Sequence, residues 1–120
     1  MSDITGRLNR LLDRVDGALA ASLVAADGIA VATANRDGAF DLEALAAELL
    51  TQVRAISDHQ RDLGVGEVDQ YSVSTDLFTI LIGRLQAGYY LLLVLERATS
   101  YGRARFELRR ARLLFEDDLG

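Results

Sequence analysis

The chain has 120 residues, of which half are hydrophobic and 26% are charged, so we expect one globular domain over residues 1–120. It has no cysteine and one histidine, which excludes a disulfide framework and a thiolate or multi-histidine metal site. The net charge of −5 disfavours general binding to phosphate backbones and anionic membranes, so we expect neither nucleic acid nor membrane insertion.

The N-terminal segment MSDITGRLNRLLDRVDG predicts a short amphipathic helix. Charges recur every few positions without an apolar core segment, so the pattern is not that of a secretory signal, and we expect a cytoplasmic protein. The apolar side chains that recur at helical spacing are Ile4, Leu8, Leu11, Leu12 and Val15.

Residues 18–34 predict a β-hairpin. Two runs of small and β-branched residues flank Asp27-Gly28, a dipeptide that suits the positive φ angles of a type I′ turn. Both faces of the first run are apolar, so the hairpin needs other elements to cover it on both sides.

A longer helix and a further strand follow. The Asp41 carboxylate can cap a helix that begins at Leu42, runs to about Leu63 and stops at Gly64. Polar and apolar residues then alternate over residues 70–75, which predicts a strand with one solvent-exposed face at the edge of a sheet.

The stretch of residues 77–95 is long enough to cross a membrane. However, Arg84 and the turn signal Gln86-Ala87-Gly88 divide it into two strands, which we expect to form a buried hairpin. Thr99 or Ser100 can cap a last helix. One face of this helix carries Tyr101, Ala104, Leu108, Ala111 and Phe115. Phe106 and Leu113 form a second apolar stripe, which we expect to pack against the first helix.

The predicted fold is therefore of the α/β (α+β) class, with a central five-stranded antiparallel sheet and the element order αββαβββα. Hairpins that are apolar on both faces require helices on both faces of the sheet. We expect the first and last helices to share one face and the second helix to lie alone on the other.

The second helix has an unusual outer surface. At ~100° per residue, the positions opposite its apolar side are mostly small, where a solvated helix usually places long charged residues. This small-residue stripe consists of Ala44, Ala47, Thr51, Ala55 and Asp58. One interpretation is that alanine is simply the best helix former. The other is a dimer interface in which two copies of the helix lie side by side about a two-fold axis.

The predicted edge strand favours the second interpretation. Its open N–H and C=O groups can pair with the same strand of a second copy and extend the sheet. We predict this edge-strand pairing at Gln70, Ser72 and Ser74.

No catalytic, metal-binding or cofactor-binding residue is predicted. His59 has no triad partners, because adjacent helix positions point in different directions, and we interpret it as a solvated side chain. The two Asp-Gly pairs and Gly64-Val65-Gly66 match no phosphate, calcium or dinucleotide motif and are interpreted as turns.

The last helix carries five arginines and one acid, Glu107. The arginines are Arg103, Arg105, Arg109, Arg110 and Arg112. A solvated face, a surface for an acidic protein partner and a nucleic-acid site all remain open for this helix. The carboxylates at residues 116–118 are interpreted as a solvated tail.

The chain resembles the roadblock/dynein light chain family, and its bacterial gliding-protein MglB-like branch in particular. The resemblance rests on the element order, the hairpin ASLVAADGIAVATA, the helix LEALAAELLTQVRAI and the strands FTILIGRL and YYLLLVLE. It implies a dimer with a continuous sheet whose paired second helices, at Ala47, Thr51 and Ala55, form a platform for a Ras-like small GTPase.

In the MglB-like branch, the resemblance further implies that the dimer stimulates GTP hydrolysis without donating an arginine finger. We therefore expect a regulator or scaffold and not an enzyme. The alternative functions are a protein-interaction module unrelated to GTPases, such as a motor light chain or a two-component scaffold, and a small-molecule sensor, which would need a cavity within the fold.

Overall fold

The computed structural model describes residues 3–36, 38, 40–97 and 101–115. Its elements are α1 (Ile4–Arg14), β1 (Ala18–Val24), β2 (Ala30–Asn35), α2 (Leu42–Asp62), β3 (Gln70–Ser74), β4 (Phe78–Arg84), the short 3₁₀ turn η1 (Gln86–Gly88), β5 (Tyr90–Glu96) and α3 (Tyr101–Leu114). The five strands form one antiparallel sheet in the order β2-β1-β5-β4-β3. The predicted fold class and element order are thus confirmed.

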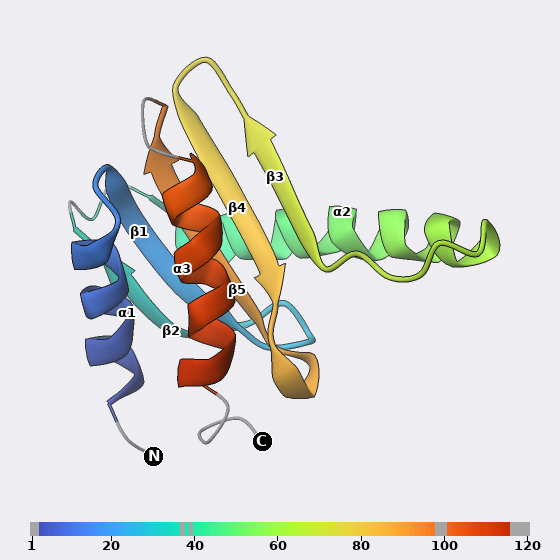
Figure 1. The fold of residues 1–120 in the computed structure, drawn as a ribbon, viewed down its shortest axis with the longest axis horizontal. Coiled ribbons are helices and arrows are strands. Elements are labelled where there is room, and N and C mark those ends of the chain that lie inside the picture. Colours follow the sequence, from blue (N-terminus) through green and yellow to red (C-terminus); the bar gives the residue numbers. More distant parts are fainter. Residues whose placement is uncertain (1–2, 37, 39, 98–100, 116–120) are drawn as a thin grey trace.

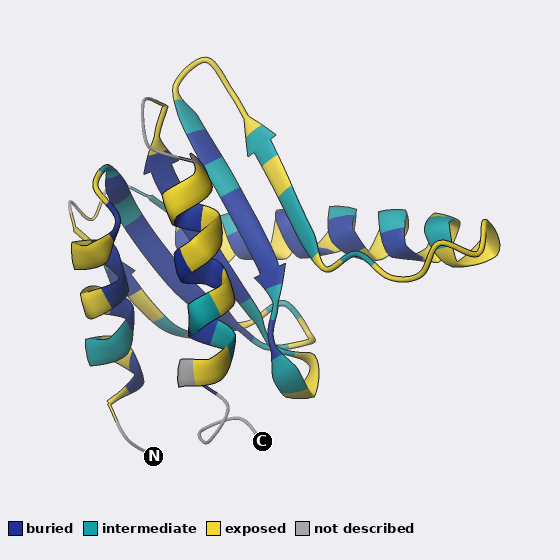
Figure 2. Cartoon of the chain, in the orientation of Figure 1, coloured by how far each residue is buried: buried dark blue, intermediate teal, exposed yellow. Residues whose placement is uncertain are grey.

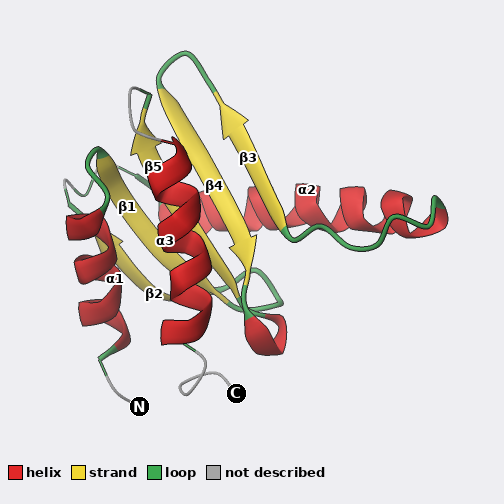
Figure 3. Cartoon of the chain, viewed as in Figure 1, coloured by secondary structure: helices red, strands yellow, loops and turns green. Residues whose placement is uncertain are grey.

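The helices lie in two layers on opposite faces of the sheet (Figures 1 and 3). α1 and α3 run side by side over one face, whereas α2 crosses the other face alone. This arrangement confirms the expectation that the first and last helices cover one face of the sheet and the second helix covers the other. None of the helices in the described part of the chain is both long and apolar enough to span a bilayer.

Side-chain caps define where the helices begin. The Asp3 carboxylate accepts the Gly6 N–H of α1 at 3.0 Å, and the Asp41 carboxylate accepts the Ala44 N–H of α2 at 3.1 Å. Thr99 and Ser100, the predicted caps of α3, lie outside the described residues, as do the carboxylates at residues 116–118.

The predicted end of α2 before Gly64 is confirmed, and the helix ends in a Schellman motif. Gly64 has a φ of 77°, its N–H donates to the Arg61 carbonyl at 3.1 Å, and the Val65 N–H donates to the Gln60 carbonyl at 3.1 Å. Because a glycine takes this backbone conformation without steric cost, the helix ends there and the chain turns back.

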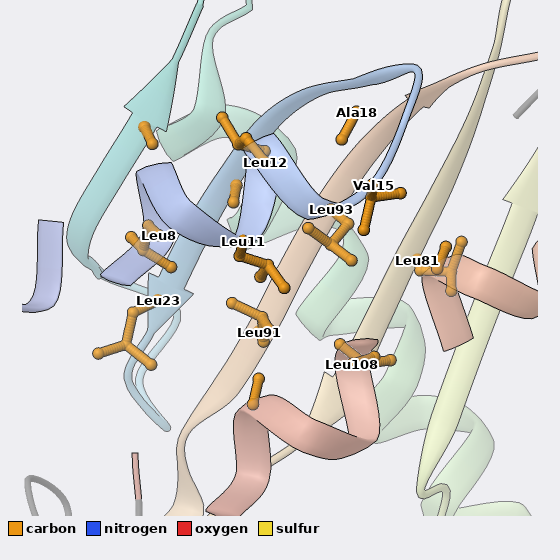
Figure 4. Close-up of a cluster of buried hydrophobic side chains, with 14 of the residues drawn as sticks. Leu8, Leu11, Leu12, Val15, Ala18, Leu23, Leu81, Leu91, Leu93 and Leu108 are labelled. Carbon is orange, nitrogen blue, oxygen red and sulfur yellow. The ribbon is translucent and has the colours of Figure 1, made fainter. Parts of the chain in front are cut away.

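The sheet separates two hydrophobic cores. The core under α1 and α3, shown in Figure 4, includes Leu8, Leu11, Leu23, Leu91, Leu93 and Leu108. The core under α2 includes Val24, Leu49, Leu50, Val53, Leu92 and Val94. The central strands β1 and β5 are therefore buried on both faces, whereas β3 is partly exposed (Figure 2).

A register shift in β1 places two alanines, two positions apart in the strand, in different hydrophobic cores. Ala18 and Ala20 would share a face in a regular strand, but the pairing with β5 is irregular between them. Ala18 therefore packs in the core under α1, and Ala20 packs in the core under α2.

The predicted type I′ turn at Asp27-Gly28 is wrong. That turn requires positive φ at both residues, but only Gly28, with φ 90°, has it. The Ala25 N–H donates to the Ile29 carbonyl at 2.9 Å, which encloses a three-residue loop. In such a loop only the last residue is left-handed, so an Asp-Gly sequence serves either turn and does not distinguish between them.

The expected packing of Phe106 and Leu113 against α1 is also wrong. Phe106 is 52% exposed and Leu113 is 71% exposed. Both point away from the sheet, and the core-facing side of α3 is made by Ala104, Leu108 and Ala111. Helical spacing showed that the two side chains share a stripe, but it carries no information about which neighbour that stripe meets.

A candidate protein-interaction surface

The small-residue stripe is exposed along the whole of α2. All five of its residues are exposed, and the opposite side of the helix is buried on the sheet. The buried side consists of Leu42, Ala46, Leu49, Leu50, Val53 and Ser57. Leu45 and Ile56, at the borders of this buried side, are half-buried.

The two polar residues of the stripe already have hydrogen-bond partners in α2. The Thr51 hydroxyl donates to the Ala47 carbonyl at 2.8 Å, and the Asp58 carboxylate accepts from Arg61 at 2.7 Å. Since the Thr51 hydroxyl is satisfied within the helix, burying this residue against a partner leaves no unpaired hydroxyl. The stripe thus presents small, mostly apolar groups to its surroundings.

β3 is an edge strand of the sheet, and β2 forms the opposite edge. The Arg84 N–H donates to the Asp69 carbonyl at 2.9 Å, and the Thr75 N–H donates to the Phe78 carbonyl at 2.8 Å. Residues on an antiparallel edge strand alternate in the direction of their backbone groups. Gln70, Ser72 and Ser74 therefore direct their N–H and C=O groups away from β4, toward the side where a further strand would pair.

α2 extends beyond this edge. Figure 1 shows the helix continuing past β3, so that its last turns and the following loop project from the sheet. The loop is fastened along the helix, because the Val68 N–H donates to the Ser57 hydroxyl at 3.1 Å. In addition, the Tyr71 hydroxyl of β3 donates to the Gln52 side chain at 3.2 Å. The second half of the stripe and the β3 edge are therefore held together.

Two large apolar side chains at this projecting end were missed by the sequence analysis. Leu63 is 77% exposed and Val65 is 68% exposed. They flank Gly64, so their only signal in the sequence is the presence of apolar residues on both sides of a helix stop. Their exposure on a projecting segment marks a candidate contact with another chain.

The first half of the stripe lies beside the β1–β2 turn. A Cβ at Gly28 would be 3.8 Å from Leu50 Cδ2 and 3.9 Å from Ala47 Cα. Ile29 and Val31, directly after this turn, are 65% and 49% exposed. The structure therefore brings the N-terminal part of the stripe next to an exposed apolar pair that the sequence analysis had not singled out.

The basic side of α3 borders a cleft of about 530 Å³ at the start of β3. Within the cleft, Arg84 pairs with Glu67 at 2.6 Å, and Arg112 pairs with Asp69 at 2.9 Å and donates to the Arg84 carbonyl at 2.7 Å. Arg105 and Arg109 also line it. Arg84 and Arg112 thus connect α3 to the sheet.

His59, on α2, is exposed, as expected for a solvated side chain.

No model of a protein family and no curated protein matches the sequence. Solved structures do match. A roadblock/LC7 domain from Streptomyces avermitilis has a TM-score of 0.89 at 19% identity, with 98% of each chain covered. An MglB structure with a tetrameric arrangement has a TM-score of 0.86 at 17% identity and covers 99% of this chain and 93% of its own.

MglC from Myxococcus xanthus is less similar in structure but more similar in sequence. Its TM-score is 0.68 at 29% identity, with 95% of this chain and 97% of its own covered. Together these matches confirm the predicted resemblance. The chain has the roadblock/LC7 fold, and its structural neighbours include roadblock/LC7 domains and the proteins MglB and MglC.

Proposed function

We propose that this chain forms a two-fold homodimer through α2 and β3, and that the dimer regulates or scaffolds a Ras-like small GTPase in the cytoplasm. The observation that carries the proposal is the exposed small-residue stripe of α2 beside the open edge of β3. The chain acts through binding and has no catalytic site of its own.

Three surfaces contribute to the proposed dimer. The stripe at Ala47, Thr51 and Ala55 allows the backbone of a second α2 to approach closely, because small side chains keep the axes near one another. The β3 edge supplies backbone groups that pair with a second β3. The projecting end of α2, with Leu63 and Val65, reaches past the edge, where the partner copy would cover it.

The GTPase part of the proposal rests on the likeness to MglB. The family resemblance implies that paired second helices form the platform for the GTPase, and the position of α2 supports this because, in the described part of the chain, no other helix covers its face of the sheet. By the same resemblance, the dimer would stimulate hydrolysis by reshaping the active site of the GTPase.

An arginine introduced into the stripe tests the dimer. Ala47→Arg or Thr51→Arg places an unpaired cation in the interface, which costs several kcal/mol and should weaken the dimer by about 100-fold or more. Asn9→Arg, at an exposed position of α1 on the other face of the sheet, is the matched control. Sedimentation velocity should show a dimer for the wild type and the control and a monomer for the stripe variants. Unchanged sedimentation of both stripe variants contradicts a dimer through α2.

GTP turnover tests the regulatory part. Candidate small GTPases from the same organism are assayed for GTP hydrolysis and nucleotide exchange with the wild type, Thr51→Arg and Asn9→Arg. We expect the wild type and Asn9→Arg to change one of these rates and Thr51→Arg to leave it unchanged. If no GTPase responds while the wild type remains a dimer, the GTPase role is rejected in favour of an interaction module such as a motor light chain or a two-component scaffold.

A further inference from the structure

A second exposed apolar surface lies on α3, across the sheet from α2. Phe106 and Leu113 are seven residues apart, so their directions differ by only about 20° around the helix. Both are more than half exposed, at 52% and 71%. At Gly102, one turn before Phe106, a Cβ would meet nothing within 4 Å. We call the surface formed by Gly102, Phe106 and Leu113 with the flanking Arg103, Arg109 and Arg110 the outer face of α3.

Arginines frame this apolar stripe on both sides. The guanidinium carbons of Arg103 and Arg110 lie 5.7 Å and 6.0 Å from the centre of the Phe106 ring, within the range of cation–π contact. Arg109 lies on the other side of the stripe at ~100° per residue. Positive charge and exposed apolar groups therefore occur together on one helix face.

A buried carboxylate holds part of this frame in place. Glu107 is fully buried, and its Oε1 lies 3.1 Å from Arg110 Nη1 and 3.6 Å from Arg103 Nη2. Two guanidinium groups share one carboxylate, so their side of the face keeps a net positive charge. Because Glu107 anchors both arginines, they lose less conformational freedom when a partner binds.

The charge of this face argues against a second copy of the same face as its occupant. α3 carries five arginines and one glutamate, whereas the whole chain has a net charge of −5. Two copies meeting through α3 would bring arginine against arginine, which is unfavourable. A partner with complementary charge must instead carry carboxylates beside apolar side chains.

The shape of the face fits a helix. Its residues run along about three turns, with apolar positions seven residues apart and charges on either side, which is the pattern by which two amphipathic helices pack side by side. An interfacial membrane helix would present a much broader apolar face than Phe106 and Leu113 provide. We propose that the outer face of α3 binds an acidic amphipathic helix of a partner protein, independently of the α2–β3 dimer.

A synthetic helical peptide tests this proposal. The probe has about 18 residues, with leucines along one stripe and glutamates beside them; a control peptide has lysine in place of every glutamate. Fluorescence anisotropy should show that the acidic peptide binds the wild type and the lysine peptide does not. Raising the ionic strength should weaken this binding, because salt screens the arginines.

Variants of the face identify where the peptide binds. Phe106→Ser with Leu113→Ser should weaken binding about tenfold or more, and Arg109→Glu should weaken it while leaving Arg103, Arg110 and Glu107 intact. Asn9→Arg on α1 is a control that should bind as the wild type does. Since all substituted side chains are exposed, the variants should keep the circular dichroism spectrum and the sedimentation of the wild type.

Three results would overturn the proposal. The first is equal binding of both peptides, and the second is full affinity in the Phe106→Ser, Leu113→Ser variant. The third is Phe106-dependent binding to vesicles of phosphatidylglycerol and phosphatidylcholine with no binding of the acidic peptide, which would assign the face to a membrane surface. Each of these results is independent of whether the α2–β3 dimer forms.

Discussion

Ala87, in the turn between β4 and β5, is the only non-glycine residue in the described part of the chain with a positive φ, at 57°. Gly88 follows it with φ 79°, so both central residues of the turn are left-handed, as a type I′ turn requires. The Tyr89 N–H donates to the Gln86 carbonyl at 3.1 Å and closes the turn. An alanine side chain in this conformation costs about 1–2 kcal/mol.

Ala87→Gly should therefore stabilise the protein. Glycine removes the left-handed penalty but makes the unfolded chain more flexible, so we expect a net gain of about 0.5–1 kcal/mol in the free energy of unfolding. Urea denaturation measures this value. Ala26→Gly is the control, because Ala26 also lies in a turn but does not have a positive φ. This substitution makes the unfolded chain equally flexible and removes no left-handed penalty, so it should not stabilise the protein. A loss of stability in Ala87→Gly would contradict the strain assigned to Ala87.

Among the elements, α3 packs on the sheet at a point where β4 has a glycine, Gly83, beneath it. A Cβ at Gly83 would be 2.6 Å from Leu108 Cδ2 and 2.9 Å from Leu108 Cγ. The absence of a side chain at residue 83 thus lets Leu108 reach the backbone of β4. The Arg112 guanidinium then reaches the Arg84 carbonyl at 2.7 Å, at the next position of the strand.

Gly83→Ala should push α3 away from the sheet and destabilise the fold by about 1–3 kcal/mol, measured by urea denaturation. Gly102→Ala is the matched control on α3, because a Cβ there meets nothing within 4 Å. It should stabilise by about 0.5–1 kcal/mol through helix propensity. In a Leu108→Ala background, the cost of Gly83→Ala should shrink, because the clashing atoms are gone. An undiminished cost in that background would locate the clash elsewhere.

The elements themselves were predictable from local signals. Apolar periodicity identified α1 and the buried side of α2, and the carboxylate of Asp41 and the stop at Gly64 defined the ends of α2. Turn types were less predictable, because Asp27-Gly28 suits two kinds of hairpin while Ala87-Gly88 takes a conformation that alanine disfavours. In the second case the pairing of β4 with β5 imposes the turn on the sequence.

At the scale of the whole molecule, the proposed dimer links stability to protein concentration. A dimer that forms only from folded chains is stabilised by mass action. About a hundredfold increase in protein concentration adds about 2.7 kcal/mol, per mole of dimer, to the free energy of unfolding. The thermal midpoint of the wild type should therefore rise by several degrees over such a range, as measured by circular dichroism. The midpoint of Thr51→Arg should not depend on concentration. An invariant wild-type midpoint would contradict the dimer.

The candidate site was predictable only in part, because it depends on how the elements are placed. The angular positions of Ala44, Ala47 and Thr51 follow from the sequence, and so does their exposure once α2 is known to cover a sheet. The projection of Leu63 and Val65 beyond β3 depends on where α2 crosses the sheet, which is a non-local property. The direction of Phe106 likewise depends on the position of α3 relative to α1.

The open edge of β3 has a consequence for partner choice. Backbone N–H and C=O groups are the same in every protein, so the proposed pairing along Gln70, Ser72 and Ser74 would stabilise association without selecting which chain associates. Discrimination between an identical copy and a related chain in the same cell must then come from side chains, chiefly the stripe of α2 and the projecting Leu63 and Val65. Substitutions in α2 are therefore the natural route by which such chains would diverge into separate, non-exchanging pairs.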